Sequence, residues 1–473
     1  MGALRKNSEI LEFDNSISPQ TAAEKLLSRD PEIILFSVYI WNLVITYETL
    51  LIIKNIRPDI KVVVGGPEVS YEYEDSLTVQ TADHLIRGEG ETVIEQVCRT
   101  LLQQGRLEAC GTVSQASSLP KVIDAPPADL NTVVLPYEEY TDEDIAHRRV
   151  YVESTRGCPF SCSYCLSSLE TGIRKIPHER LFPIFDKLIG RGARIFKFID
   201  RSFNACPNHA EKILAFFLNH QCNGMMLHLE WEPHLLPKNL LKILQKSPDG
   251  FFQLEAGVQT FTPDVAKRIN RRLTTETVEK NIRLLSTLPS VHLHADLIAG
   301  LPGETLESLS ESFDRLHACG PHEIQLGILK KLRGAPIAEH DREFGMVYNC
   351  APPYDVLQTS TMSFPELQAV RRFARFWDIT VNNGRFPNCA PFIWNNQPSV
   401  FTAFMEWSNW LYEQTHAVFG FTPTRLGRLM TRFLTEERNI SLEEVSLRMK
   451  SDFNSKISIE KGMERQTRHQ TRP

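Results

Sequence analysis

The sequence predicts an α/β protein with a doubly wound parallel-sheet N-terminal domain, a partial (β/α)6 TIM-type barrel and a helical C-terminal segment. Continuous apolar stretches of strand length alternate with helix-length segments, which is typical of parallel sheets covered on both faces. The alternation stops near residue 106 and resumes at Arg149, so it forms two separate runs. A chain of 473 residues also exceeds a single core, at roughly 150 residues per domain.

Residues 1–110 form the first run. Its buried strands are predicted at 32–38, 60–66 and 83–91, and a helix is predicted at 43–56. A Gly-rich turn follows each of the last two strands. The residues of these turns are Gly65, Gly66, Pro67, Gly88, Glu89 and Gly90. Because open α/β sheets bind ligands at the carboxyl ends of their strands, we predict a ligand site at these turns.

Residues 111–148 differ in character from the segments on either side. They contain prolines, serines and acidic residues without sustained periodicity, and we predict a linker. In residues 149–335 the alternation resumes, with strands predicted at 150–155, 194–200, 225–231, 251–259, 291–300 and 323–329. Six such units in one run indicate an open or partial barrel. Residues 336–473 are aromatic and helical in pattern and predict a mainly helical extension.

The composition is that of an ordinary globular protein, with 42% hydrophobic and 23% charged residues. A net charge of −6 gives no reason to expect a nucleic-acid partner. The longest apolar stretch falls short of the ~18 uninterrupted apolar residues that a membrane span needs, so no membrane association is expected. Seven of the ten cysteines are scattered singly, which suits the reducing cytoplasm. We therefore predict a cytoplasmic protein.

The other three cysteines, Cys158, Cys162 and Cys165, stand in a C-x3-C-x2-C spacing directly after the first barrel strand. Three thiolates on one short loop can hold a single metal centre, and soft sulfur ligands select zinc or an iron–sulfur cluster. A structural zinc site needs a fourth ligand, for which His178 is the nearest candidate. A cubane iron–sulfur cluster held by three cysteines instead leaves one iron open for chemistry.

This spacing, with Tyr164 immediately before the third cysteine, resembles the signature of radical S-adenosylmethionine (radical SAM) enzymes. The resemblance implies a 4Fe-4S cluster on Cys158, Cys162 and Cys165 and S-adenosylmethionine on its open iron. It also implies reductive cleavage of S-adenosylmethionine to a 5′-deoxyadenosyl radical. An electron donor such as flavodoxin or ferredoxin would then be a partner.

Three later strand ends extend the resemblance over roughly residues 150–330. "KFIDRSF" is similar to the second-strand edge of the family, "LEAGVQT" to the fourth and "DLIAGLPGET" to the fifth. The resemblance places the first motif near the methionine amino group, the second near the ribose and the third under the adenine. The implied S-adenosylmethionine contacts are Tyr164, Asp200, Arg201, Ser202, Glu255, Gln259, Ile298 and Gly300.

The N-terminal run resembles the cobalamin-binding-type domain of many radical SAM enzymes, which implies cobalamin at the two Gly-rich turns. The Asp-x-His-x-x-Gly motif of that domain is absent, because Asp83 and His84 are adjacent. We therefore expect any bound cobalamin to have no histidine from this domain beneath its cobalt. "SEILEF", residues 8–13, looks like the second strand of the domain, so its first strand is expected to be missing.

The predicted function is cleavage of S-adenosylmethionine, with cobalamin-dependent methyl transfer or rearrangement on an unknown substrate. Methylthiotransferases carry three upstream cysteines, whereas only Cys98 and Cys110 precede Cys158 here, so that subgroup is set aside. The alternative is a non-catalytic cobalamin-sensing or redox-sensing protein, or a degenerate iron–sulfur protein. The C-terminal stretch "PPYDVLQTSTMS" looks like the extension of an uncharacterised branch of the subgroup.

Overall fold

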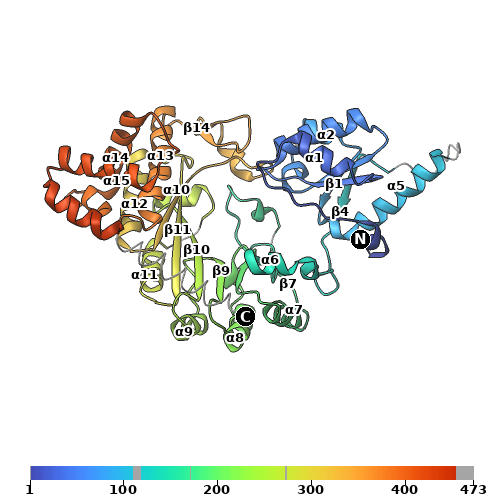
Figure 1. The fold of residues 1–473 in the computed structure, drawn as a ribbon, viewed down its shortest axis with the longest axis horizontal. Helices are drawn as coiled ribbons and strands as arrows, with labels where there is room; N and C mark the ends of the chain where they lie inside the picture. The colour runs from blue at the N-terminus through green and yellow to red at the C-terminus, as the bar shows by residue number, and fades with distance from the viewer. Residues whose placement is uncertain (1, 110–118, 171, 272–273, 454–473) are drawn as a thin grey trace.

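The computed structural model describes residues 2–109, 119–170, 172–271 and 274–453. In Figure 1 the N-terminal sheet domain lies on one side of the barrel, and the C-terminal helices lie on the other. No helix in these residues is both long and apolar enough to cross a membrane.

The N-terminal domain is a four-stranded parallel sheet whose strand order follows the chain. Its strands are β1 (Ile33–Ser37), β2 (Lys61–Gly65), β3 (His84–Gly88) and β4 (Val122–Ala125). Apolar side chains are buried on both faces. Its helices are α1 (Pro19–Leu27), α2 (Leu43–Ile56), α3 (Pro67–Ser70), α4 (Leu77–Thr81) and α5 (Ile94–Ala109). Side chains of α1, α2 and α4 pack on one face of the sheet and those of α5 pack on the other, which confirms the predicted covered sheet.

Two expectations about this domain are wrong. The predicted linker contains β4, which pairs with β3 from Leu85↔Val122 to Gly88↔Ala125. This strand was missed because it is only four residues long and Asp124 interrupts its apolar residues. Residues 8–13, expected to be a strand, form none, and Ile10 is 67% exposed because no sheet covers it.

The rest of the predicted linker lies against the barrel. It includes a 3-10 turn (Pro136–Glu139) and α6 (Asp142–His147), and Tyr137 and Ile145 belong to the barrel core. Residues 110–118 of the predicted linker lie outside the described residues.

The barrel is a six-stranded parallel sheet, as predicted. Its strands, in order from one edge, are β5 (Val150–Val152), β8 (Ile195–Phe198), β9 (Met226–Trp231), β10 (Phe252–Gln259), β11 (Val291–Ala299) and β12 (Glu323–Ile328). The helices are α7 (His178–Gly190), α8 (Pro207–Asn219), α9 (Lys238–Lys246), α10 (Pro263–Arg268), α11 (Thr275–Ser286) and α12 (Leu306–Ala318). In β10 and β11, buried residues alternate strictly with half-buried ones, so one face packs on helices and the other lines the barrel interior.

The C-terminal segment shares the core of the barrel. It comprises β13 (Val347–Tyr348), β14 (Val356–Gln358), α13 (Phe364–Trp377), α14 (Val400–Thr415) and α15 (Pro423–Glu436). Phe373, Trp377 and Phe401 pack their rings around Phe313 of α12. One continuous apolar cluster therefore runs from Ala128 to Val445, and these helices cap the side of the barrel. Residues 454–473 of the extension lie outside the described residues.

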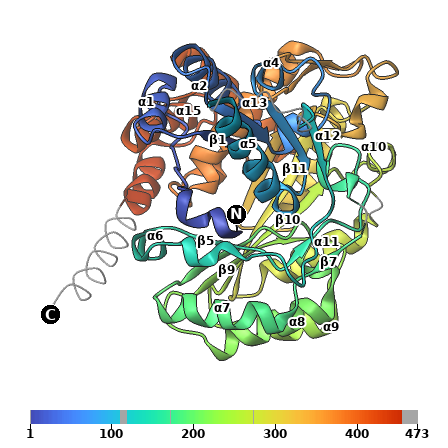
Figure 2. The ribbon, with the colours of Figure 1, turned by 90° about the vertical axis from the view of Figure 1, so that its right-hand side faces the viewer.

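Polar contacts join the carboxyl edge of the N-terminal sheet to the barrel. Glu68, in α3 directly after β2, lies 3.1 Å from Arg333 and 2.5 Å from the Tyr354 hydroxyl. The Gly334 amide donates to Glu72. Figure 2 shows the N-terminal domain in front of the barrel. The edge where a parallel sheet binds ligands thus faces the loops of the barrel.

Candidate active site at the carboxyl edge of the barrel

The three clustered cysteines lie on a loop that is closed at its base by a short antiparallel pair. β6 (Thr155–Arg156) pairs with β7 (Arg174–Lys175), and the cysteines lie in the excursion between them. Gly157 opens the loop with a φ of +87°, and a side chain there would collide with the Gly172 carbonyl. All three thiols are free. The fold therefore presents three thiols on one loop at the carboxyl edge of β5.

Asp200 fixes the start of this loop. Its carboxylate accepts hydrogen bonds from the Ser154 amide at 2.9 Å and from the hydroxyls of Ser154 and Thr155 at 2.6 Å each. Burial raises the pKa of Asp200 to about 6 despite these donors. Both oxygens are used within the fold, and Asp200 does not line the cavity described next. Asp200 thus positions the cysteine loop, and its predicted contact with S-adenosylmethionine stays a prediction.

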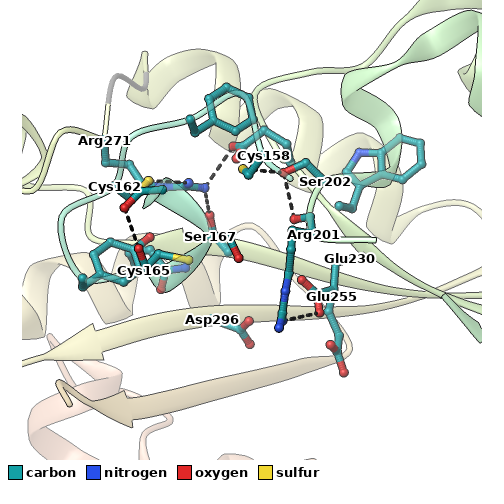
Figure 3. A pocket seen from close by; sticks show the side chains of 17 residues that line it. Cys158, Cys162, Cys165, Ser167, Arg201, Ser202, Glu230, Glu255, Arg271 and Asp296 are labelled. Atoms are coloured by element: carbon teal, nitrogen blue, oxygen red, sulfur yellow. Dashed lines mark hydrogen bonds and ion pairs between the residues drawn. The ribbon is translucent and has the colours of Figure 1, made fainter. Parts of the chain in front are cut away.

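A cavity of roughly 300 Å³ lies beneath the loop. The three cysteines line one wall, and Glu230, Glu255 and Asp296 line the other, from the neighbouring strands β9, β10 and β11 (Figure 3). The predicted site residues that line it are Cys158, Cys162, Tyr164, Cys165, Arg201, Ser202, Glu255 and Gln259. Sequence motifs on separate strands therefore meet in one space.

Two carboxylates on the far wall differ in protonation. Burial favours a raised pKa for Glu255, but a 2.6 Å contact to His228 and the nearby Lys197 outweigh it and lower the pKa to about 2. The cation near Asp296 is Arg271, whose charge acts to lower the pKa of Asp296. Burial and the charges of Glu255 and Glu230 raise the pKa of Asp296 to about 7. At neutral pH Glu255 is therefore an anion, whereas Asp296 is partly protonated.

Two side-chain oxygens that line this cavity are buried and lack a partner. The Oδ1 atom of Asp296 and the Oε1 atom of Gln259 make no hydrogen bond. Gln259 has a φ of +72°, and its side chain folds over Gly257, where a side-chain carbon would collide with it. Buried polar groups without partners are costly, so these two oxygens are suited to hydroxyl or ammonium groups of a ligand.

Arg271 is a site residue that the sequence did not reveal. Its guanidinium lies 3.6 Å from the Cys162 sulfur and 2.9 Å from Glu232, and it donates to the Gly257 carbonyl. Only 8% of its side chain is exposed. A buried cation beside the cysteine loop favours bound thiolates. It follows α10 with no motif around it, so only the folded chain identifies it.

The arrangement of the thiols argues against a single zinc ion. Within the described residues, the one three-residue group whose donor atoms all lie within 4.8 Å of one another is elsewhere, so the three sulfurs are spread further apart. Zinc–sulfur bonds of about 2.3 Å would hold them closer than this. His178, the candidate for a fourth zinc ligand, contacts His209. Their rings lie 4.4 Å apart, and the Nε2 atom of His178 lies 3.4 Å from the His209 carbonyl. The donor set therefore fits a larger cluster.

Two predicted adenine contacts do not line the cavity. Ile298 shares the inner face of β11 with Asp296, one step nearer the carboxyl edge, and remains half-buried. Gly300 has a φ of +84°, and a side chain there would meet Val356 at 2.5 Å. Glycine is thus required at position 300 because β14 approaches closely there. Of the two residues, Ile298 is the one able to face a ligand.

The Gly-rich turns of the N-terminal domain are largely used by the fold itself. A side chain at Gly66 would lie 2.5 Å from the Val38 carbonyl oxygen, and one at Gly88 would lie 2.5 Å from that of Ala125. Both glycines have positive φ. A side-chain carbon at Gly90, by contrast, would meet only Ile86, at 3.7 Å. The first two glycines therefore permit close strand contacts, and Gly90 remains open to a ligand.

Glu89, whose contact with cobalamin stays a prediction, forms ion pairs with the barrel domain. It pairs with Arg174 and, at 2.8 Å, with Arg156, and it accepts from the Ala128 amide at 2.8 Å. These two arginines face each other across the base of the cysteine loop. Burial acts to raise the pKa of Glu89, but the hydrogen bonds from Arg174, Ala128 and Arg156 outweigh it and lower the pKa. Glu89 thus ties the N-terminal domain to the cysteine loop.

The only histidine of residues 1–110 lies at the wrong edge to reach a ligand at the turns. His84 begins β3, whereas the turns follow its end at Gly88. Its Nδ1 donates to the Pro120 carbonyl at 2.9 Å. At the carboxyl edge of β1, Trp41 is 62% exposed and stacks on Tyr39 at 4.5 Å. An exposed aromatic pair here could pack on an apolar ligand.

Three family models match separate parts of the chain. Residues 2–98 match the B12 binding domain, residues 152–316 match the radical SAM superfamily, and residues 342–471 match a protein of unknown function (DUF4080). These matches support the predicted 4Fe-4S cluster, S-adenosylmethionine and cobalamin as the cofactors. The last match agrees with the expected extension of an uncharacterised branch.

Curated relatives are similar at low identity. The cobalamin-dependent radical SAM methyltransferase TokK of Streptomyces tokunonensis is 25% identical over 63% of this chain and 47% of its own length. The 2-(S-pantetheinyl)-carbapenam-3-carboxylate methyltransferase of Streptantibioticus cattleyicolor is 24% identical over 85% of this chain and 64% of its own length. An anaerobic magnesium-protoporphyrin IX monomethyl ester cyclase of Cereibacter sphaeroides is 22% identical, over 63% and 51%. The chain thus spans less than two thirds of each of these relatives.

Solved structures show the same fold. The cobalamin-dependent S-adenosylmethionine radical enzyme OxsB, with aqua-cobalamin and S-adenosylmethionine bound, covers 94% of this chain and 75% of its own at a TM-score of 0.57 and 14% identity. The methyltransferase TsrM of Kitasatospora setae, with tryptophan and a SAM analogue bound, covers 71% of each chain at a TM-score of 0.53 and 17% identity.

Proposed function

We propose that this chain, a radical SAM enzyme with an N-terminal B12-binding domain, cleaves S-adenosylmethionine in the cavity beneath its cysteine loop. The observation that carries the proposal is the meeting of three free thiols with two unpartnered buried oxygens, on Asp296 and Gln259, in one cavity. The thiols offer a metal-cluster site and the oxygens offer a site for a polar ligand beside it.

The residues of the cavity have distinct roles in this proposal. Cys158, Cys162 and Cys165 hold three irons of a 4Fe-4S cluster, and Arg271 balances their negative charge. When bound, the cluster supplies the single electron that breaks the sulfur–C5′ bond of S-adenosylmethionine, giving methionine and the 5′-deoxyadenosyl radical. Arg201 and Ser202 lie beside Cys158, where the methionine part would bind.

The far wall suits the remaining groups of S-adenosylmethionine. Glu255, held as an anion by His228, and the oxygens of Gln259 and Asp296 can accept hydrogen bonds from ribose hydroxyls. Tyr164 lines the cavity beside the cysteines. These side chains bind and orient, and the fold holds them on strand ends.

Methyl transfer is the reaction that we propose on the similarity to relatives named as methyltransferases, with rearrangement or ring formation as the alternative because a relative is named as a cyclase. Trp41 and Gly90 are the residues of the N-terminal edge that can face cobalamin. Glu89, Gly66 and Gly88 make contacts within the fold itself.

A flavodoxin or ferredoxin is proposed as the electron donor, since the cluster must be reduced one electron at a time. A cytoplasmic location is proposed because the nine cysteines in the described residues are all free, as they are in a reducing compartment.

The experiment is anaerobic reconstitution with iron and sulfide, followed by dithionite and S-adenosylmethionine. Wild type and Cys350→Ala, a change at an exposed cysteine outside the loop, should both release 5′-deoxyadenosine. Cys162→Ala should release none. An iron-loaded wild type that binds S-adenosylmethionine but releases none under several reductants would favour the non-catalytic alternative.

A further inference from the structure

A second group of metal-ligand side chains lies at the amino edge of the barrel, at the opposite ends of the strands from the cysteine loop. His292 and His294 stand two residues apart on β11, so they project from the same face as Asp296, toward the barrel interior. Glu323 begins β12 and is the ladder partner of His294. Strand register therefore brings two imidazoles and one carboxylate together from neighbouring strands.

The donor atoms of these three side chains converge on one point. The Nε2 atoms of His292 and His294 lie 2.8 Å and 3.1 Å from the same oxygen of Glu323. One atom from each residue lies within 4.8 Å of the other two, a spacing that a single ion can bridge. His294 and Glu323 are 15% and 27% exposed, whereas His292 is 45% exposed. The group is thus walled by protein on one side and open to an entering ion on the other.

The neighbouring side chains support these donors without competing with them. His322 accepts a hydrogen bond from the Leu293 amide at its Nδ1, so its neutral ring keeps the proton on Nε2 and cannot use that nitrogen as a ligand. Its ring packs against that of His292 at 4.8 Å. The Nε2 atom of Gln253 lies 3.2 Å from His294 Nε2, and a flip of this amide would bring its oxygen to the same point.

We propose that His292, His294 and Glu323 bind a divalent transition-metal ion of the zinc type, separate from the iron–sulfur cluster. Two imidazoles and a carboxylate are the donor set of mononuclear sites that keep one position for water. Imidazole nitrogen selects zinc over magnesium or calcium, which prefer oxygen. Because β12 is the edge strand of the sheet, the ion would tie the start of that strand to β11.

The first test is a zinc titration of the holoenzyme, in which the reconstituted cluster already occupies the three cysteines. With a chromophoric chelator as competitor, wild type should bind one equivalent of Zn²⁺. His294→Ala and Glu323→Gln should each weaken that binding by at least about tenfold, since each removes a donor or its charge. The matched control is His220→Ala, at a partly exposed histidine that pairs with Asp186 on another part of the surface.

The second test needs no variant. X-ray absorption at the zinc edge should show nitrogen and oxygen neighbours at about 2.0–2.2 Å and no sulfur. Sulfur neighbours at about 2.3 Å would place the zinc on cysteines and overturn the proposal. So would the absence of bound zinc, or zinc binding that is equal in wild type, His294→Ala and Glu323→Gln. Failure here leaves the S-adenosylmethionine chemistry untouched, because the two sites are loaded and measured separately.

Discussion

The cysteine loop and the Gly-rich turns of the N-terminal domain are both short motifs at the carboxyl edge of a parallel sheet. In the cysteine loop, the three thiols form no disulfide and line a cavity, so they are available to a ligand. Most residues of the Gly-rich turns are instead used in contacts within the fold. Gly66 and Gly88 give room to Val38 and Ala125, and Glu89 pairs with two arginines of the barrel domain.

The difference lies in what each residue type can be used for. A cluster of thiols has few structural uses in a reduced protein, so its presence points to a metal. Glycine is needed wherever backbone segments approach closely, with or without a ligand. A carboxylate such as Glu89 serves equally well as a ligand contact or an ion pair. Motifs made of chemically specific donors therefore predict function better than motifs made of permissive residues.

The largest expected effect concerns Gly66. Replacing it by Ala puts a carbon 2.5 Å from the Val38 carbonyl at a φ of +108°, which we expect to cost roughly 3 kcal/mol. Amide exchange in β1 and β2 should then accelerate by about a hundredfold. Gly90→Ala is the matched control and should change little. Equal exchange in the two variants would mean that Gly66 is not required by the fold.

The next effect concerns the proton on Asp296. Its pKa of about 7 in the free site means that its negative charge appears as the pH rises through 7. The affinity of the cluster-loaded enzyme for the cationic S-adenosylmethionine should therefore rise between pH 6 and pH 8. Asp296→Asn should bind about tenfold more weakly at pH 8, as loss of a charge-assisted hydrogen bond implies. The affinity of the Asp296→Asn variant for S-adenosylmethionine should not vary between pH 6 and pH 8. Equilibrium dialysis at each pH measures the affinities of wild type and variant.

A wild-type affinity that is constant from pH 6 to pH 8 would remove Asp296 from the contacts with S-adenosylmethionine. Glu230→Gln is a useful companion variant, because Glu230 lines the same cavity but pairs with Arg201.

A smaller effect is expected at the tie between the two regions. Glu89→Gln should weaken the pairing of β6 with β7 by about 1–3 kcal/mol, because it removes the charge that Arg174 and Arg156 share, and only Arg156 keeps close carboxylates, Glu91 and Glu153. Faster amide exchange at Arg156 and Arg174 would report it. Glu91 is a more exposed carboxylate that also pairs with Arg156. Glu91→Gln should weaken the pairing of β6 with β7 by less than about 1 kcal/mol.

The pH dependence of this tie follows from the lowered pKa of Glu89. A carboxyl with a lowered pKa in the folded state stabilises fully above its unfolded pKa and loses that contribution as the pH falls. The difference between wild type and Glu89→Gln should therefore shrink on acidification and stay constant above neutral pH. A difference that grows on acidification would contradict the ion-pair account.

The smallest effect is expected at His84. Because it lies at the amino end of β3 and donates to Pro120, His84→Ala should leave cobalamin uptake nearly unchanged. Trp41→Ala should reduce uptake, since it removes the exposed ring at the carboxyl edge. Gel filtration followed by a cobalamin spectrum measures both. A loss of uptake in His84→Ala alone would show that the cofactor reaches the other edge.

Periodicity predicted the strands well because β2 is a continuous buried run, whereas β10 and β11 alternate buried with half-buried residues. It missed β4, which is only four residues long and depends on pairing with β3. The site was predicted where motifs carry specific donors, as at Cys158, Cys162 and Cys165. Arg271 and the His292–His294–Glu323 group could not be predicted, since a loop position and a strand register decide them.

The central claim is that the three thiols hold a cluster whose fourth iron binds S-adenosylmethionine. Mössbauer spectroscopy of the chain reconstituted with ⁵⁷Fe, with and without S-adenosylmethionine, tests it most directly. We predict about four irons per chain, one of which changes its spectrum when S-adenosylmethionine is added. Iron spectra that S-adenosylmethionine leaves unchanged, or zinc in place of iron at the cysteines, would contradict the claim.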